Sequence, residues 1–341
     1  MKVALVYGTD FKSISPGGVQ NYLKRLIGSA PQSANLTVFG IGKPPSEFAH
    51  RFVSVVDPLE ITGKLNWSFS RALGKVDFSE YDQVIFQRAE NLLFVRRARN
   101  QKFVLILHGG TANAWLSNKS FFSFIYPALE AVAIFRSTKV FSVSVSGTWN
   151  YLLFRKKILR APRVFDSKVF NPLNVKEDRR DFAVIGRLSK EKQFHLAIEA
   201  LSKACAEGQV KARLLVIGSG DEEPRLRAIP TSELLAIEFL GQKTPSEVAD
   251  LLKSRVRILL ITSLFEGFPL AALEAAACRV KLLGINAPGV TNSLAELGFP
   301  VSKSFESFKV AVANSITLSE PDQPYSQPKD ESSAFWDYFL Q

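Results

Sequence analysis

The sequence predicts an α/β protein with two domains, each built around a parallel β-sheet. Short apolar stretches with the length of strands alternate with helical patterns along the chain, an order typical of parallel sheets covered by helices. The 341 residues exceed the number that one hydrophobic core usually serves. Gly17 and Gly186 each follow a strand-like stretch, so each is expected to open one half of the chain.

The first half begins with a strand at residues 2–7, and a glycine-rich segment at 15–21 opens a helix. A later apolar strand at 104–107 leads directly into His108. A histidine that follows a buried strand is more often a structural residue than a binding one. The pattern around His108 alone therefore leaves both interpretations open.

The boundary between the halves is expected near residue 172. Residues 170–172, Phe-Asn-Pro, interrupt the alternating pattern, and a polar stretch follows at 176–180. We therefore predict a first domain over residues 1–171 and a second domain over residues 172–324.

Two cations flank a strand-to-helix turn early in the second half. A strand at 181–185 is followed by a turn at 186–192, which contains Arg187 and Lys192, and then by a helical pattern. In an open α/β sheet the ligand crevice lies at the carboxyl ends of the strands, so both cations can face a diphosphate there. The alternative is that they are ordinary surface cations. A further strand and turn at 213–220 ends in two glycines, a weak signal alone.

A second strand, turn and helix follow at 256–278. The apolar run 256–261 has the length of a buried strand, and Gly267 permits a tight turn after it. Pro269 suits the first position of a helix, and the alanine-rich stretch that follows propagates a helix well. The N–H groups at the start of such a helix predict an anion site.

Glu266 and Glu274 lie on either side of this helix start. Glu274 is expected about 7.5 Å further along the helix axis than Pro269, at roughly 1.5 Å per residue, so the two carboxylates can reach different hydroxyl groups of one ligand. They can also be a solvated loop glutamate and a capping helix glutamate. A hydrolase with paired carboxylates is a third interpretation, but it explains neither Arg187 nor Lys192.

Taken in order, these motifs resemble the retaining glycosyltransferase family 4, also described as glycosyl transferases group 1. The family has the GT-B architecture, in which two Rossmann-like domains with parallel sheets face each other across a cleft. The segments that carry the resemblance span most of the chain: 2–7, 15–21, 104–110, 186–192, 214–220, 239–241 and 265–274.

The resemblance implies a role for each matching residue. Arg187 and Lys192 would hold the diphosphate of a nucleotide-sugar donor. Glu274 would bind the ribose hydroxyls, and Glu266 would bind hydroxyls of the donor sugar. The turn at Gly267 and the backbone of Phe268, Pro269 and Leu270 would help to bind the donor.

The first domain would bind the acceptor. Gly17 and Gly18 would let the first helix approach the donor phosphates, and His108 would lie over the reacting sugar. In this architecture the C-terminal tail, here residues 325–341 with four aromatic side chains in its last ten residues, commonly packs back on the first domain.

Three positions depart from the family pattern. The helix that carries Glu274 usually ends in glycine and proline, but here Arg279 and Val280 follow Cys278. The usual paired glycines further on are represented by Pro288 and Gly289, and the linker that often contains Gly-Val-Asp reads Val-Phe-Asp at 164–166.

The implied reaction is the transfer of a hexose, with retention of configuration, to an acceptor hydroxyl. No Asp-x-Asp pair follows a strand, so we expect no metal ion and no cofactor. The cations and the helix start would stabilise the charge that develops on the leaving diphosphate. The alternatives are a non-catalytic sugar-nucleotide binder, or an epimerase or phosphorylase of the same architecture.

The positive charge lies in the first half. Residues 1–170 contain 23 Lys and Arg against 10 Asp and Glu, a net charge of +13, and the remainder has a net charge of −2. Clusters at 96–99 and 155–163 would attract anionic lipid headgroups, which favours a lipid-linked acceptor or a precursor of a cell-surface polysaccharide. The alternative is basic faces that only keep the protein in solution. No nucleic-acid-binding motif accompanies the charge, so nucleic acid is not expected as a partner.

The remaining sequence features favour a cytoplasmic protein that can lie peripherally on the inner face of the membrane. The two cysteines, Cys205 and Cys278, are too few for a disulfide framework and are expected to be buried thiols. The start of the sequence does not match a signal peptide. The longest apolar tract, 121–135, contains Pro127 and Glu130 and is too short to span a bilayer.

Overall fold

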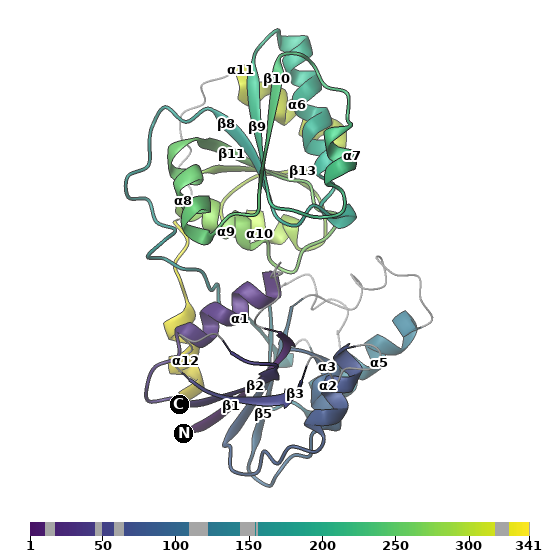
Figure 1. Ribbon diagram of the computed structural model, residues 1–341, viewed down its shortest axis with the longest axis vertical. Helices are drawn as coiled ribbons and strands as arrows, with labels where there is room; N and C mark the ends of the chain where they lie inside the picture. The colour runs from purple at the N-terminus through teal and green to yellow at the C-terminus, as the bar shows by residue number, and fades with distance from the viewer. Residues whose placement is uncertain are drawn as a thin grey trace. The chain divides into compact units, whose positions relative to one another are not determined.

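The computed structural model describes residues 1–10, 18–44, 50–57, 65–108, 122–143, 154, 156–317 and 327–340. The chain divides into two compact units (Figure 1). Unit 1 contains Met1–Val164 together with Glu331–Gln341, and unit 2 contains Phe165–Asp330. The chain thus passes from unit 1 to unit 2 between Val164 and Phe165, whereas the sequence predicted a boundary near residue 172.

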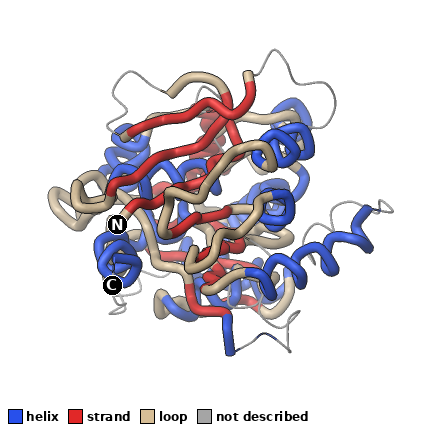
Figure 2. Tube along the Cα trace, turned by 90° about the horizontal axis from the view of Figure 1, so that it is seen from below, coloured by secondary structure: helices blue, strands red, loops and turns tan. Residues whose placement is uncertain are grey.

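Unit 1 is built on a parallel sheet with the strand order β3-β2-β1-β4-β5-β6-β7. The order reverses at β1, because β2 and β3 lie on one side of it and β4 on the other, which is the arrangement of a doubly wound fold. Helices lie against the strands, as Figure 2 shows in blue and red. The strands are β1 (Lys2–Asp10), β2 (Asn35–Ile41), β3 (Arg51–Val56), β4 (Gln83–Phe86), β5 (Lys102–Leu107), β6 (Lys139–Ser142) and β7 (Ile158–Arg160).

The sheet of unit 1 forms because its central strands are almost entirely apolar. Every described residue of β4 is buried, and so are the last five residues of β5. Each large apolar side chain that is removed from water in this way contributes about 1.5–3 kcal/mol. The helices are α1 (Gly18–Gly28), α2 (Leu65–Leu73), α3 (Ala89–Phe94), α5 (Phe122–Arg136) and α12 (Ser332–Leu340).

Helix α12, at the end of the sequence, packs on unit 1 through aromatic side chains. Trp336 is fully buried, and its Nε1 donates hydrogen bonds to the Leu26 carbonyl at 3.0 Å and to Ser29 Oγ at 3.2 Å. Phe141 of β6 has ring centroids 5.6 Å from both Phe335 and Phe339. These contacts make α12 a part of the core of unit 1.

Unit 2 is built on a second parallel sheet with the order β10-β9-β8-β11-β12-β13. Its strands are β8 (Asp181–Ile185), β9 (Ala212–Ile217), β10 (Leu235–Gly241), β11 (Val256–Ile261), β12 (Lys281–Ile285) and β13 (Val301–Ser302). Its helices are α6 (Phe194–Gly208), α7 (Glu223–Arg227), α8 (Pro245–Ser254), α9 (Leu270–Ala277), α10 (Val290–Glu296) and α11 (Phe305–Thr317), and a short 3₁₀ helix, η3 (Lys190–Lys192), precedes α6. The strand order reverses between β8 and β11, so these neighbouring strands mark the switch point of the sheet.

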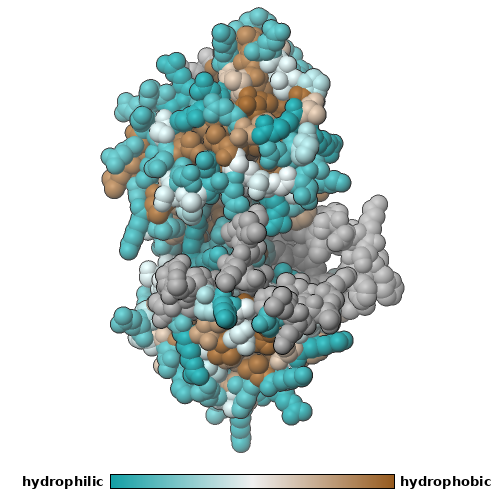
Figure 3. All heavy atoms as spheres, viewed as in Figure 1, coloured by the Kyte–Doolittle hydropathy of each residue, from teal (hydrophilic) through white to brown (hydrophobic). Residues whose placement is uncertain are grey.

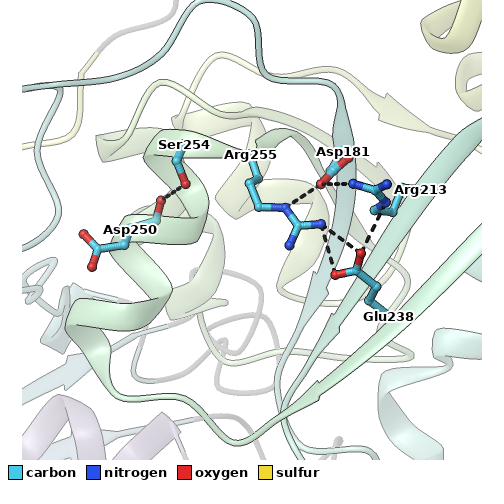
Figure 4. A network of polar contacts seen from close by, with 6 residues as sticks. All are labelled: Asp181, Arg213, Glu238, Asp250, Ser254 and Arg255. Carbon is cyan, nitrogen blue, oxygen red and sulfur yellow. Dashed lines mark hydrogen bonds and ion pairs between the residues drawn. The ribbon is translucent and has the colours of Figure 1, made fainter.

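Alternating charges fix the strands of unit 2 to one another (Figure 4). Arg255, which precedes β11, donates from Nε to Asp181 at 2.8 Å and from a terminal nitrogen to both oxygens of Glu238 at 3.0 and 3.1 Å. Arg213 of β9 contacts the same two carboxylates at 3.9 and 3.3 Å. Because Asp181 is the first residue of β8, this network lies toward the amino end of the sheet.

Hydrophilic side chains cover much of the face shown in Figure 3, with apolar residues exposed in separate patches on each unit. Within the described ranges, no helix combines the length and the apolar character needed to cross a bilayer.

Candidate functional site

The candidate site lies at the carboxyl ends of β8 and β11, the two strands at the switch point of unit 2. These strands pair in parallel, with Phe182 opposite Ile258. The loop after β8 leads through η3 into α6, and the loop after β11 leads into α9. Because the strands are neighbours, the sheet brings the side chains of both loops together.

A close backbone approach shapes the loop after β8. A Cβ atom on Gly218, at the end of β9, would lie 1.9 Å from the carbonyl oxygen of Gly186. Only glycine fits at this distance. The next residues continue the contact, because the Leu188 N–H donates to the Ser219 carbonyl at 2.9 Å. The paired glycines of the 213–220 segment therefore support the loop that carries Arg187 and Lys192.

Lys192 and Glu266 form an ion pair between the two loops. Lys192 Nζ lies 2.5 Å from Glu266 Oε1, and the side chains are 23% and 14% exposed. Ser263 Oγ donates to the same carboxylate oxygen at 2.6 Å. Thr262 Oγ1 donates to the Lys192 carbonyl at 2.9 Å. Two residues that the sequence predicted for donor binding are thus in direct contact.

Arg187 lies in the same loop as Lys192, with its side chain exposed. Within the described parts of the chain, its guanidinium has no ion-pair or hydrogen-bond partner, in contrast to Lys192. A guanidinium without a partner presents its fork of N–H donors to an anion from solution.

The loop that carries Glu266 is fixed by backbone contacts. The Leu264 N–H donates to the Glu191 carbonyl at 2.8 Å, and the Glu266 N–H donates to the Pro288 carbonyl at 2.9 Å. Gly289 has a φ of +80°, and a Cβ atom there would lie 1.8 Å from the Glu266 carbonyl oxygen. Although the family's paired glycines are reduced to Pro288 and Gly289, the glycine stands where this loop requires it.

Helix α9 begins one residue later than the sequence predicted. Pro269 is its N-cap residue, not its first helical residue, and the Pro269 carbonyl accepts hydrogen bonds from Ala272 and Leu273 at 2.9 and 3.3 Å. No described side chain caps this end. The first two helical residues, Leu270 and Ala271, therefore present backbone N–H groups without intrahelical partners, next to Phe268 and Gly267.

Glu274 lies in the fifth position of α9, where the residue is 9% exposed. The helix ends in a turn in which Val280 N–H donates to the Ala275 carbonyl at 2.9 Å and Arg279 N–H donates to the Ala276 carbonyl at 3.0 Å. Arg279 has a φ of 57°, the left-handed conformation for which glycine is usual after a helix. The turn that ends α9 is therefore kept, although Arg279 stands where the family usually has glycine.

The sequence did not identify Arg179 as a residue that supports the site. It donates to the carbonyls of Leu252 at 3.0 Å, Cys278 at 3.1 Å and Arg279 at 2.7 Å. One guanidinium therefore caps the C-terminal ends of both α8 and α9. The only signal was its place in the polar stretch 176–180. Ser263 was also missed, although it precedes Glu266 by three residues.

The other predicted residues belong to unit 1. His108 follows β5 and is half-buried, and its Nε2 lies 2.5 Å from Gln87 Oε1. The ring of Tyr22, in α1, contacts the imidazole edge to face with centroids 5.2 Å apart. Desolvation by burial, together with the charge of Arg88, lowers the pKa of His108 to about 3, so the imidazole is neutral near pH 7.

The glycine-rich segment is only partly described. Gly18 is the first residue of α1, whereas Gly17 lies outside the described residues, as do the glycines that follow His108. The two cysteines are buried and free, as predicted, and burial raises the pKa of the Cys278 thiol to about 11. Among the described side chains, no group of three or more His, Cys, Asp or Glu residues could hold a metal ion.

Comparison with known proteins gives a family match within unit 2. The family model for glycosyl transferases group 1 matches residues 166–304. The chain is 29% identical over 169 residues to a component of the phosphatidylinositol N-acetylglucosaminyltransferase of Arabidopsis thaliana, a match that covers 48% of this chain and 36% of that protein. It is 38% identical over 93 residues to a GDP-mannose-dependent alpha-(1-6)-phosphatidylinositol dimannoside mannosyltransferase of Mycobacterium tuberculosis, a match that covers 27% of this chain and 24% of that protein.

The chain therefore spans about a third or less of the length of these curated relatives. The fold has wider matches. The crystal structure of WaaG, a glycosyltransferase involved in lipopolysaccharide biosynthesis, superposes with a TM-score of 0.67 at 16% identity, covering 93% of this chain and 91% of WaaG. Residues 166–304 thus belong to the glycosyl transferases group 1 family, and the chain has the predicted α/β fold of the GT-B type.

Proposed function

We propose that the protein is a retaining glycosyltransferase of family 4, which transfers a hexose from a nucleotide-diphosphate sugar to an acceptor hydroxyl. The observation that carries this proposal is the Lys192–Glu266 ion pair at the switch point of unit 2. Beside it lie the exposed guanidinium of Arg187 and the start of α9, which no described side chain caps. One anion-binding group and one hydroxyl-binding group are thereby held together.

The donor diphosphate would take Lys192 away from Glu266. Phosphate oxygens bind ammonium and guanidinium groups through charge-assisted hydrogen bonds, and the free N–H groups at the start of α9 would add to this binding. Glu266, still held by Ser263, would then accept hydrogen bonds from hydroxyls of the donor sugar. Glu274, one turn further into α9, would bind the ribose.

In the proposed reaction, the bond between the anomeric carbon and the diphosphate oxygen breaks while a bond to the acceptor oxygen forms on the same face of the sugar. The acceptor proton passes to the leaving phosphate oxygen. Arg187, Lys192 and the helix start stabilise the charge on that diphosphate, so the proposal includes neither a metal ion nor a cofactor. NMR analysis of the anomeric configuration of the product tests retention, and a chelator that abolishes activity would contradict the metal-free step.

The names of the relatives support the choice of substrates. The mycobacterial relative is GDP-mannose-dependent and is named for a phosphatidylinositol dimannoside, and the plant relative is named for phosphatidylinositol. We therefore propose a nucleotide sugar as donor and a lipid-linked acceptor, with a glycan or polysaccharide precursor as the wider class.

The decisive experiment screens nucleotide sugars for thermal stabilisation and for the release of free nucleoside diphosphate. A donor at 100 times its Kd stabilises by about 2.7 kcal/mol, which raises the melting temperature by roughly 5 °C or more. Arg187→Ala and Glu274→Ala should lose this shift. Arg227→Ala, which removes an exposed cation of α7, is the matched control and should keep it.

The outcomes separate the alternatives. Equal stabilisation of the parent, Arg187→Ala and Glu274→Ala would refute the proposed site. Stabilisation without release of nucleoside diphosphate with any acceptor would identify a non-catalytic binder. Conversion of the sugar without transfer would identify an epimerase, and a dependence on inorganic phosphate would identify a phosphorylase.

We further propose that unit 1 binds an anionic membrane surface through the C-terminal end of α5. The predicted basic clusters are only partly available there, since several of their cations bind helix ends. Lys157 Nζ donates to the carbonyls of Ile134 at 2.8 Å and Phe135 at 3.1 Å. Arg97 and Arg136 also donate to backbone carbonyls in this region.

The remaining groups around this end of α5 match an interfacial contact. Phe135 is 75% exposed and Val132 is 48% exposed. Arg96, Arg99 and Lys156 are exposed, and within the described ranges they have no ion-pair partner. Arg155, from the same predicted cluster, lies outside those ranges. Cations near an anionic surface contribute about 1 kcal/mol each, and an apolar side chain inserted beside them adds to the binding.

Liposome flotation tests this surface with vesicles of phosphatidylglycerol and phosphatidylcholine against vesicles of phosphatidylcholine alone. The protein should float with the anionic vesicles, and Phe135→Ser should weaken that binding. Val310→Ser, which changes a 59% exposed valine of unit 2, is the control. Equal binding to both kinds of vesicle, or to neither, would refute the membrane proposal and leave the site in unit 2 untouched.

A further inference from the structure

Gln87 and His108 lie side by side at the carboxyl edge of the sheet in unit 1. Gln87 directly follows β4 and His108 directly follows β5, and these strands pair in parallel with Phe86 opposite Leu105. The Gln87 amide oxygen lies 2.5 Å from His108 Nε2. The contact thus joins two loops at the edge where α/β sheets bind their ligands.

The amide nitrogen of Gln87 has no partner among the residues that the structure describes. The residue is 6% exposed, and its Nε2 is buried without a hydrogen bond. Buried polar groups are nearly always hydrogen-bonded. In the same unit, the buried Gln101 uses its whole amide: Nε2 donates to the carbonyls of Phe78 and Tyr81, and Oε1 accepts from the Ala98 N–H. The Nε2 amide of Gln87 is therefore available to donate a hydrogen bond to an oxygen atom of a ligand.

The contact between Gln87 and His108 determines which nitrogen of the imidazole carries the proton. His108 is neutral near pH 7, because burial and the charge of Arg88 lower its pKa to about 3. With Nε2–H donating to Gln87 Oε1, the imidazole is held in one tautomer and Nδ1 is left as an acceptor. The pair then offers one amide donor and one imidazole acceptor, a combination that a hydroxyl group can satisfy, since it both accepts and donates.

We propose that Gln87 holds His108 in a single neutral tautomer and donates its free N–H to a hydroxyl of the sugar substrate. Gln87 is thus a positioning residue for His108 and a determinant of which sugar hydroxyl is recognised. The recognition step rests on the proposed function, whereas the positioning of His108 does not. The hydroxyl can belong to the donor sugar or to the acceptor sugar.

The positioning step is tested on the protein without substrate. The chain contains three histidines, so ¹⁵N NMR of a histidine-labelled sample resolves each ring, and His108 is assigned from a His108→Asn variant. The parent should show His108 as one neutral tautomer, protonated at Nε2, between pH 5 and pH 8. Gln87→Met, which keeps the length of the side chain but loses its amide, should show a mixture of tautomers.

Gln83→Met is the matched control for this measurement. Gln83 is also buried and lies on β4, but its amide donates to the Phe339 carbonyl at 3.0 Å. Its replacement should disturb the contact with α12 and leave the His108 tautomer unchanged. A single Nε2-protonated tautomer in Gln87→Met, as in the parent, would overturn the positioning role.

The recognition step is tested with the nucleotide sugar that the donor screen identifies, chosen from UDP-glucose, UDP-N-acetylglucosamine and GDP-mannose. Gln87→Met should lower kcat/KM by roughly 10-fold, the usual effect of one neutral hydrogen bond. On the deoxy analogue that lacks the recognised hydroxyl, the difference in kcat/KM between parent and variant should shrink to the part that comes from the lost positioning of His108. An equal loss of kcat/KM for every analogue would overturn the recognition step.

Two arms identify the source of the hydroxyl. If the difference between parent and Gln87→Met is seen in slow hydrolysis of the donor without acceptor, the hydroxyl belongs to the donor sugar. If it is seen only in transfer, with deoxy acceptors, it belongs to the acceptor. If the parent releases no nucleoside diphosphate from any of the three donors, the proposed function and the recognition step both fail, and the NMR measurement still decides the positioning of His108.

Discussion

Lys192 and Glu266 neutralise each other across 2.5 Å at the switch point of unit 2, so a ligand that binds either side chain competes with its partner. Both side chains are partly buried, which strengthens their attraction relative to an exposed pair. The pair therefore keeps the site ordered while it is empty and competes with the ligand when it binds. This competition leads to a prediction in which the two partners behave differently.

Glu266→Gln should bind a nucleoside diphosphate more tightly than the parent and turn over more slowly. The neutral amide no longer competes for Lys192, so we expect an affinity increase of roughly 3–10-fold. Lys192→Met should bind it roughly 10-fold more weakly, because a charge-assisted contact is lost. Isothermal titration calorimetry with UDP and GDP measures both changes. Glu247→Gln, at an exposed pair with Lys243, is the control, and weaker binding by Glu266→Gln would contradict this interpretation.

Arg279→Gly should stabilise unit 2 by about 1 kcal/mol. Arg279 adopts a φ of 57° after α9, and a side chain in this conformation costs about 1–2 kcal/mol relative to glycine, part of which the greater freedom of glycine in the unfolded chain offsets. Urea unfolding measures the change. Ala228→Gly is the control, because Ala228 ends α7 with a φ of −85° and gains nothing from glycine. Destabilisation by Arg279→Gly would show that the contacts of the Arg279 side chain contribute more to stability than its left-handed backbone conformation costs.

Gly289→Ala should disturb the site more than Gly241→Ala. Both glycines have positive φ values, +80° and +66°, but a Cβ atom on Gly289 would lie 1.8 Å from the Glu266 carbonyl whereas one on Gly241 meets nothing within 4 Å. Gly241→Ala should therefore cost only the backbone term, about 1 kcal/mol. Gly289→Ala should also move the loop of Glu266 and weaken nucleoside diphosphate binding. Equal binding by both variants would contradict the role assigned to Gly289.

The stability of unit 1 should fall as the pH drops below 6.5, because of His108. Its pKa is lowered to about 3, whereas an unfolded histidine has a pKa near 6.5, so the unfolded chain binds an extra proton between these values. By linkage, this site should cost about 1–2 kcal/mol of stability between pH 6.5 and pH 5. Urea unfolding at several pH values should show a smaller pH dependence for His108→Asn. An unchanged pH dependence would mean that His108 titrates normally in the folded protein.

The strands of unit 2 could be predicted from the sequence because their signals are local. Residues 181–185 and 256–261 are mainly apolar, each with one charged residue, and they form β8 and β11 with the same bounds. The contact of Lys192 with Glu266 could be anticipated only in outline, from the rule that ligands bind at the carboxyl ends of such strands. The start of α9 was predicted one residue too early, because proline is common at both the N-cap and the first helical position.

The sequence could not indicate contacts that depend on how distant segments pack. Gln87 and His108 are 21 residues apart, and nothing local marks the glutamine as the partner of the histidine. Arg179 caps carbonyls that lie 73 to 100 residues later in the chain. Which cations of the basic clusters face solvent depends on packing for the same reason. Lys157 and Arg97 have the composition of a binding surface, but tertiary packing directs them to backbone carbonyls.

Glu331, where the chain returns to unit 1, makes an exchange of unit 2 between related proteins feasible. Its N–H donates to the Arg163 carbonyl at 2.8 Å, and its carboxylate accepts from the Arg163 N–H at 2.9 Å and from Arg160 at 2.8 Å. The segment that leaves unit 1 and the segment that returns to it are therefore hydrogen-bonded to each other where Phe165–Asp330 begins and ends. In the order of the chain, unit 2 is a domain inserted into unit 1, and both ends of the insertion meet at Glu331. A homologous second domain can therefore be exchanged at this point without breaking the sheet of unit 1.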